Sequence, residues 1–120
     1  MVTSWRSLLG LLALVLAVAG ASQWWSSRHE QRLGAQLAAL AAPGDIRMLS
    51  SETCVFCAVA RRWFSEHGVR FSECFIERDA DCAAAYQALL SPGTPLLLVR
   101  GQQQLGFSPE RVLGALKRAR

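Results

Sequence analysis

The hydrophobic residues of the chain form two different patterns, one continuous and one periodic. Residues 7–27 contain no charged side chain, and as an α-helix they would span about 30 Å, the thickness of a bilayer core. Trp5 precedes this stretch, and Trp24 and Trp25 lie near its end, where aromatic side chains anchor helices at the headgroup level. The continuous pattern predicts a membrane segment at residues 1–27.

A cleaved signal peptide is the alternative interpretation of this segment. Its most apolar part is short, and Ala17-Val18-Ala19 or Ala19-Gly20-Ala21 has the small residues that a signal peptidase needs. Basic residues flank both ends, so the charge balance does not decide the orientation. Because short N-terminal tails commonly stay cytoplasmic, we expect a single-pass protein whose C-terminal part is exported.

The periodic pattern begins after this segment. Leu33, Leu37 and Leu40 recur at helical spacing, and Pro43-Gly44 ends the pattern. Three leucines do not make a sustained heptad repeat, which argues against a dimerising stripe. We therefore predict a linker helix at residues 28–44 that acts as a stalk or packs on the following domain.

Residues 45–120 form the predicted folded domain, in which strand and helix patterns alternate in the order β-α-β-α-β-β-α. The expected strands are residues 46–49, 69–76, 95–99 and 103–107, and the expected helices follow the N-cap residues Thr53, Asp79 and Ser108. Gly68 and Ser91-Pro92-Gly93 are expected to end the first two of these helices.

The amino-acid composition argues against a disordered chain and against a nucleic-acid-binding protein. An apolar fraction of 52% argues against disorder. The net charge of +4 comes from thirteen Lys and Arg against nine acids, and the dense basic clusters are Arg61-Arg62 and the run from Lys117 to Arg120. Nucleic-acid binding usually shows a longer basic stripe with interleaved aromatic residues, so we do not expect a nucleic-acid partner.

Cys54 and Cys57 carry the most specific chemical signal in the chain. They directly follow the first expected strand and open the next helix, where free backbone N–H groups lower a thiol pKa from about 8.5 to roughly 3.5–7.5. Cys54 is therefore the predicted nucleophile that attacks a disulfide, and Cys57 is the predicted thiol that resolves the mixed disulfide. If the carboxylate of Glu52 lay close to Cys54, its negative charge would destabilise the Cys54 thiolate.

Three motifs together resemble the thioredoxin fold in its minimal glutaredoxin form. They are Cys54-Val55-Phe56-Cys57, Thr94-Pro95 before the third strand, and the run from Gly106 to Glu110. The resemblance covers the C-terminal two-thirds of the chain and implies an α/β fold, with a central four-stranded mixed sheet flanked by helices. It also implies the activity of a thiol–disulfide oxidoreductase.

The resemblance further assigns a substrate-binding role to Thr94, Pro95, Gly106 and Phe107. In glutaredoxins the proline that matches Pro95 follows a cis peptide bond, and the backbone of its predecessor pairs with the bound thiol substrate. Most X–Pro bonds are trans, so an ordinary strand entry is the alternative. The expected substrates are protein or small-molecule disulfides, with no reducing partner specified.

Glutathione is a candidate electron donor, and no bound cofactor is expected. Gly93-Thr94-Pro95 and Leu105-Gly106-Phe107 differ from the motifs with which glutaredoxins hold this tripeptide. The run from Gly106 to Glu110 is more similar to the glutaredoxin-like redoxins that serve ribonucleotide reductase. Only dithiol exchange is carried over from that resemblance.

Cys74 and Cys82 leave several alternatives open. With seven residues between them, a structural disulfide is geometrically conceivable, and two buried thiols are an equal alternative. A zinc site that also uses Cys54 and Cys57 would lack a second close pair, so no metal site is predicted. A non-enzymatic module that binds a partner at the Thr94-Pro95 groove, or binds zinc, is the alternative function.

Overall fold

The first part of the structure is a long exposed helix. The computed structural model describes residues 4–118, and the chain divides into two compact units, residues 1–32 and residues 33–120. Residues 5–32 belong to helix α1 (Trp5–Leu40), and all of them are exposed. Among the described residues, α1 is the one helix long and apolar enough to cross a membrane, a criterion that a signal sequence also meets.

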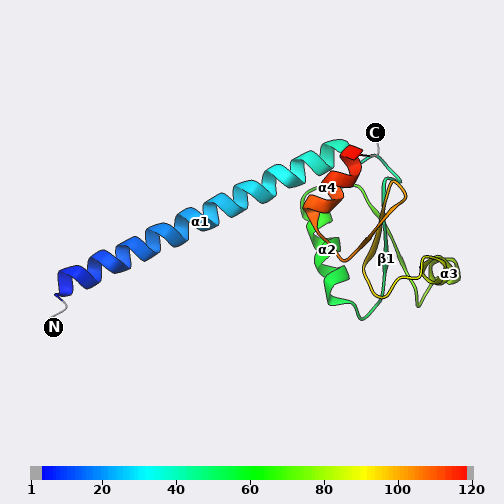
Figure 1. The fold of residues 1–120 in the computed structure, drawn as a ribbon, viewed down its shortest axis with the longest axis horizontal. Helices are drawn as coiled ribbons and strands as arrows, with labels where there is room; N and C mark the ends of the chain where they lie inside the picture. The colour runs from blue at the N-terminus through cyan, green and yellow to red at the C-terminus, as the bar shows by residue number, and fades with distance from the viewer. Residues whose placement is uncertain (1–3, 119–120) are drawn as a thin grey trace. The chain divides into compact units, whose positions relative to one another are not determined.

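The predicted membrane segment and the predicted linker helix are parts of this same helix. α1 continues without a break to Leu40 (Figure 1), and the chain then turns at Pro43 and Gly44. Leu33 and Leu37 are buried in the hydrophobic core of the second unit. The last two turns of α1 therefore form part of the folded domain that follows.

One four-stranded mixed sheet forms the centre of the second unit in the described residues. Its strands are β1 (Ile46–Ser50), β2 (Ser72–Phe75), β3 (Leu96–Val99) and β4 (Gln102–Leu105). Their order is β2-β1-β3-β4; β1 is parallel to β2 and antiparallel to β3, and β3 is antiparallel to β4. The predicted sheet is confirmed.

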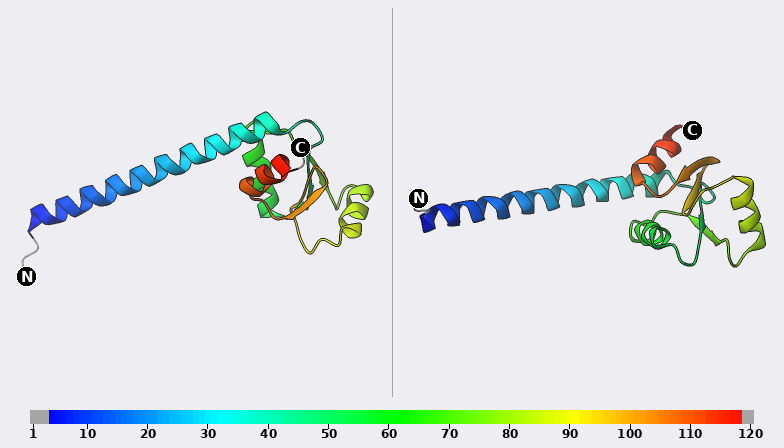
Figure 2. Two further views of the ribbon diagram at one scale, coloured as in Figure 1. Left: turned by 45° about the horizontal axis from the view of Figure 1, so that its top comes forward. Right: turned by 60° about the horizontal axis from the view of Figure 1, so that its bottom comes forward.

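Three further helices cover this sheet. They are α2 (Val55–Glu66), α3 (Ala80–Ala88) and α4 (Pro109–Arg118). α2 and α4 lie on one face of the sheet and α3 lies on the other (Figure 2). Asp79 caps α3 by accepting hydrogen bonds from the backbone N–H groups of Asp81 and Cys82, as its residue type predicts.

The structure corrects three sequence-based boundaries, of which the first is the fourth strand, at residues 102–105 instead of residues 103–107. Cys54, not Thr53, is the N-cap of α2, because the Cys54 backbone is extended and its side chain accepts a hydrogen bond from the N–H of Cys57. The second strand covers residues 72–75 instead of residues 69–76, because its pairing with β1 begins only at Ser72. Val69 is still buried, although it lies outside the strand.

The two faces of the sheet carry separate hydrophobic clusters. Side chains alternate between the faces of a strand, so Ile46 and Met48 join the cluster that contains Phe64 of α2 and Leu116 of α4, whereas Leu49 joins the smaller cluster with α3. Both clusters consist of fully buried side chains at their centres. This arrangement fixes the N-terminus of α2 directly beyond the end of β1.

Arg100 joins three segments of the second unit. Its guanidinium donates hydrogen bonds to the carbonyl oxygens of Leu40 and Leu116, at 3.4 and 2.8 Å, and to the carboxylate of Asp45, at 3.1 Å. The hydrogen bond from Arg100 and a second from the N–H of Ala42 lower the pKa of Asp45 below its ordinary value. Arg100 thus fastens the end of α1 to the sheet and to α4.

Candidate active site

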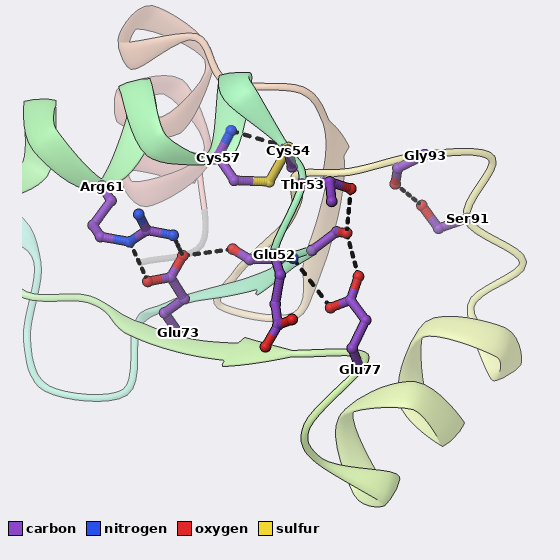
Figure 3. Close-up of a disulfide and its surroundings, with 11 residues drawn as sticks. Glu52, Thr53, Cys54, Cys57, Arg61, Glu73, Glu77, Ser91 and Gly93 are labelled. Carbon is purple, nitrogen blue, oxygen red and sulfur yellow. Dashed lines mark hydrogen bonds and ion pairs between the residues drawn. A yellow bond between two sulfur atoms is a disulfide. The ribbon is translucent and has the colours of Figure 1, made fainter.

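The Cys54–Cys57 pair lies at the N-terminus of α2, where it forms a disulfide with a Cα–Cα distance of 5.2 Å. The Sγ atom of Cys54 accepts a hydrogen bond from the backbone N–H of Cys57, with an N–Sγ distance of 3.0 Å (Figure 3). Cys54 is half-buried and Cys57 is fully buried. Cys54 is therefore the more accessible of the two cysteines.

This geometry favours a thiolate on Cys54 when the disulfide is reduced. The first turn of a helix has N–H groups without partners inside the helix, and here one of them already points at the Cys54 sulfur. A hydrogen bond to the charged form of a group, together with the helix dipole, stabilises that form. The site can thus supply a nucleophilic sulfur beside a buried second thiol.

A groove begins beside this helix and has a volume of about 320 Å³. It is lined by Phe56, Val59, Thr94, Pro95, Gly106, Phe107 and Arg111. All four residues of the predicted substrate-binding set thus lie together. The Thr94–Pro95 peptide bond is cis, as the resemblance implies, and the N–H of Gly106 donates to the carbonyl oxygen of Pro95 at 2.9 Å.

The exposed side of the first turns of α2 is apolar. Val55 and Phe56, the two residues between the cysteines, are 73% and 72% exposed, and Val59 one turn further along is also exposed. Arg111 is the charged residue among those that line the groove, and its guanidinium donates to the carbonyl oxygen of Leu105 at 3.1 Å. Sequence patterns did not single out Arg111, because it lies on α4, far along the chain from the cysteines.

A polar network holds the loop that leads to Cys54. Glu52 forms an ion pair with Arg78, and its backbone N–H donates to the carboxylate of Glu77 at 3.1 Å. The hydroxyl of Ser51 also donates to Glu77, and this hydrogen bond lowers the pKa of Glu77. Since Arg78 balances the charge of Glu52, the expected effect of Glu52 on the Cys54 thiol is weakened.

A second polar cluster lies beneath α2, one turn after Cys57. Arg61 donates to both carboxylate oxygens of Glu73, at 2.6 and 2.8 Å (Figure 3). Ser50 donates to the same carboxylate at 2.6 Å. Burial opposes ionisation of Glu73, but the hydrogen bonds from Arg61 and Ser50 outweigh it, so the pKa of Glu73 is lowered. The cluster joins α2 to β1, which carries Ser50, and to β2, which carries Glu73.

Comparison with known proteins identifies the domain. The glutaredoxin family model matches residues 46–103. Residues 46–103 are therefore a glutaredoxin-like domain, called the glutaredoxin domain from here on. No curated protein matches the chain.

Solved structures show that the glutaredoxin domain has the thioredoxin-like fold. A mutant form of the thioredoxin-like protein BC3987 is 20% identical with a TM-score of 0.56, over 62% of this chain and 96% of that one. The glutaredoxin from Methanosarcina mazei Go1 is 20% identical with a TM-score of 0.52, over 61% and 78% of the two chains. The glutaredoxin-like NrdH-redoxin from Escherichia coli is 22% identical with a TM-score of 0.50, over 56% and 88%.

The glutaredoxin domain carries a second disulfide away from α2. Cys74 of β2 and Cys82 of α3 are joined, with a Cα–Cα distance of 6.0 Å. Cys82 is fully buried, and a guanidinium nitrogen of Arg47 lies 3.8 Å from the Cys74 sulfur. Within residues 4–118, no three His, Cys, Asp or Glu side chains gather as metal ligands. The four cysteines form two separate pairs instead of one cluster.

Proposed function

We propose that the protein is a membrane-attached thiol–disulfide oxidoreductase that works through Cys54 and Cys57. The observation that carries this proposal is the position of the Cys54 sulfur, which caps α2 and accepts the N–H of Cys57 while its partner is buried. At the start of a helix, N–H donors and the helix dipole favour the thiolate that exchange requires, and this half-buried sulfur is also accessible. The glutaredoxin domain supports the same chemistry.

The reaction follows from the two sulfurs. In the reduced protein, the Cys54 thiolate attacks a substrate disulfide, the substrate S–S bond breaks, and one substrate sulfur leaves as a thiolate. Cys57 then loses its proton and attacks the Cys54 sulfur, which releases the second substrate thiolate. Two electrons have passed to the substrate, and the protein holds the Cys54–Cys57 disulfide that the structure contains. An external thiol or a reductase returns it to the dithiol.

The groove suggests how substrates are held. An extended segment that enters beside Cys54 would meet the backbone of Thr94 and the apolar side chains of Phe56 and Phe107. Protein disulfides flanked by apolar residues suit this surface better than glutathione does, because that peptide carries two carboxylates and an ammonium group. Arg111 supplies one cation for such a carboxylate, so glutathione is the second candidate, as an electron donor.

Turnover by the full chain in detergent tests the activity. We expect the wild type to reduce insulin disulfides with dithiothreitol as donor, and the Cys54→Ser variant to lose this activity. The double variant Cys74→Ser/Cys82→Ser is the control, because it removes two sulfurs that lie outside the groove. Equal activity of the wild type and Cys54→Ser would contradict the proposed role of Cys54, and no activity above that of dithiothreitol alone would favour a module that only binds a partner.

A substrate comparison separates the two candidate ligands. We expect the wild type to reduce a protein disulfide faster than a mixed disulfide of glutathione. Arg111→Gln is expected to slow the glutathione reaction selectively, through a higher KM, because it removes the cation in the groove. An equal loss with both substrates would mean that Arg111 only supports the local structure.

Attachment to the membrane is tested separately. We expect the full chain to stay in the pellet after carbonate extraction and to keep its N-terminal residues, because residues 7–27 are uncharged and sufficient to span a bilayer. A mature N-terminus near residue 22 would instead identify a cleaved signal peptide. In both cases the redox domain is expected on the non-cytoplasmic side.

A further inference from the structure

A cluster of aromatic and basic side chains lies on α1, outside the glutaredoxin domain. Trp24, Trp25, Arg28, His29 and Arg32 line a surface hollow of about 150 Å³. They are three and four residues apart, so they fall on one face of the helix. The guanidinium of Arg28 lies over the ring of Trp24, 4.6 Å from its centre.

The charges on this face have one sign. Arg28 and Arg32 are one helical turn apart, and two like charges at this spacing repel each other. Glu30, the nearest acid in the sequence, is two residues from both Arg28 and Arg32, which places it on the opposite side of a helix with 3.6 residues per turn. An anion held between the two guanidinium groups would relieve their repulsion.

The position of the cluster indicates which anion it meets. The uncharged residues 7–27 end directly before Arg28, which is where lipid phosphates lie at the edge of a membrane-spanning helix. Trp24 and Trp25 are 59% and 73% exposed in the protein alone, and indole rings are stabilised at the headgroup level. A guanidinium fork matches two oxygens of one phosphate.

We propose that this face of α1 binds the phosphate of an anionic phospholipid between Arg28 and Arg32, with the two tryptophans packed against the upper part of the acyl chains. This proposal rests on the proposed membrane attachment. The site selects anionic lipids from a mixed bilayer and fixes the depth at which α1 leaves the membrane.

Quenching of tryptophan fluorescence tests the proposal on the full chain in phosphatidylcholine vesicles. Phosphatidylglycerol with brominated chains is added in increasing amounts, and the quenching gives its binding constant relative to brominated phosphatidylcholine. We expect a preference for the anionic lipid of about fivefold for each guanidinium. The double variant Arg28→Gln/Arg32→Gln is expected to bring the ratio close to one, and Arg62→Gln on α2 is the control for loss of charge alone.

Each other outcome is informative. A ratio near one in the wild type, or an unchanged ratio in Arg28→Gln/Arg32→Gln, would overturn the proposal. A preference lost only in Arg6→Gln would place the lipid contact at the other end of the helix and also overturn it. Loss of the preference in 20 mM inorganic phosphate would identify a site for a free anion. Carbonate extraction of the same variants keeps this result separate from a failure of membrane attachment.

Discussion

The ion pair beneath α2 makes the stability of the domain depend on pH in a specific way. The carboxylate of Glu73 accepts three hydrogen bonds, two from Arg61 and one from Ser50. Its side chain is 12% exposed, and that of Arg61 is 38% exposed. Breaking a fully buried pair costs about 3–5 kcal/mol and an exposed pair contributes about 0–1 kcal/mol, so we expect Glu73→Gln to cost about 2 kcal/mol at pH 7.

The sign of the pH dependence follows from the pKa of Glu73, which folding lowers from its ordinary value of 4.5. The ionised carboxylate stabilises the folded state fully above the unfolded pKa, and this contribution disappears as the pH falls through the lower folded pKa. The difference between the wild type and Glu73→Gln should therefore be constant from pH 7 down to about 5 and shrink at more acidic pH.

Urea unfolding of the oxidised full chain in detergent, repeated at several pH values between 7 and 3, measures this difference. Glu66→Gln is the matched control, since Glu66 lies at the exposed end of α2 and should change the free energy of unfolding by less than about 0.5 kcal/mol. A cost for Glu73→Gln that is equally large at pH 3 would refute the electrostatic explanation. It would mean that the loss of a hydrogen-bond acceptor, and not the loss of charge, determines the cost at this position.

Three further substitutions test other contacts by urea unfolding. Gly34→Ala should destabilise the domain by about 1–3 kcal/mol, because its new methyl group would overlap the ring of His67. Replacing Cys74 and Cys82 by serine and alanine should cost about 2.5 kcal/mol, the loop entropy for a sequence separation of 8. Arg100→Lys should cost about 1–2 kcal/mol, because lysine keeps the charge but not the fork that reaches three acceptors.

Each of these substitutions has a control or an opposing result. Gly20 lies in open space on α1, so Gly20→Ala should leave the free energy of unfolding unchanged. An equal loss of stability in Gly20→Ala and Gly34→Ala would exclude a clash with His67 as the cause. Alkylation of the unfolded, unreduced wild type at Cys74 or Cys82 would show that this disulfide does not form in solution. Arg70→Lys, at an exposed position, should not change the free energy of unfolding. A loss of stability as large as that of Arg100→Lys would mean that replacing any arginine by lysine destabilises the protein.

The order of strands and helices was predictable because local patterns carry it. Alternating or continuous apolar runs mark β1 and β3, and an acid or a hydroxyl marks the start of α3 and α4. The choice of Cys54 over Thr53 as the N-cap of α2 was not predictable in this way. Both residues precede an apolar run, and only the observed hydrogen bond to the Cys54 sulfur separates them.

The polar clusters around the site were not predictable, because their partners are far apart in the sequence. Arg61 and Glu73 are separated by 12 residues, and Ser50 and Glu73 by 23. No local periodicity connects a helix residue with a strand residue at such distances. One sequence signal did connect Arg61 with the site. Arg61 lies four residues after Cys57, the spacing at which two helix residues share a face.

The topology of the sheet explains why motifs about forty to fifty residues apart form one groove. β1 ends at the edge where Cys54 begins α2, and β3, which is antiparallel to β1, starts at this same edge directly after Thr94 and Pro95. β4 is antiparallel to β3, so it ends there at Leu105, directly before Gly106. The groove therefore depends on the pairing of β1 with β3 in this register. A shift of one residue would turn the core side chains of β3 to the opposite face, so the hydrophobic core and the site are fixed by the same pairing.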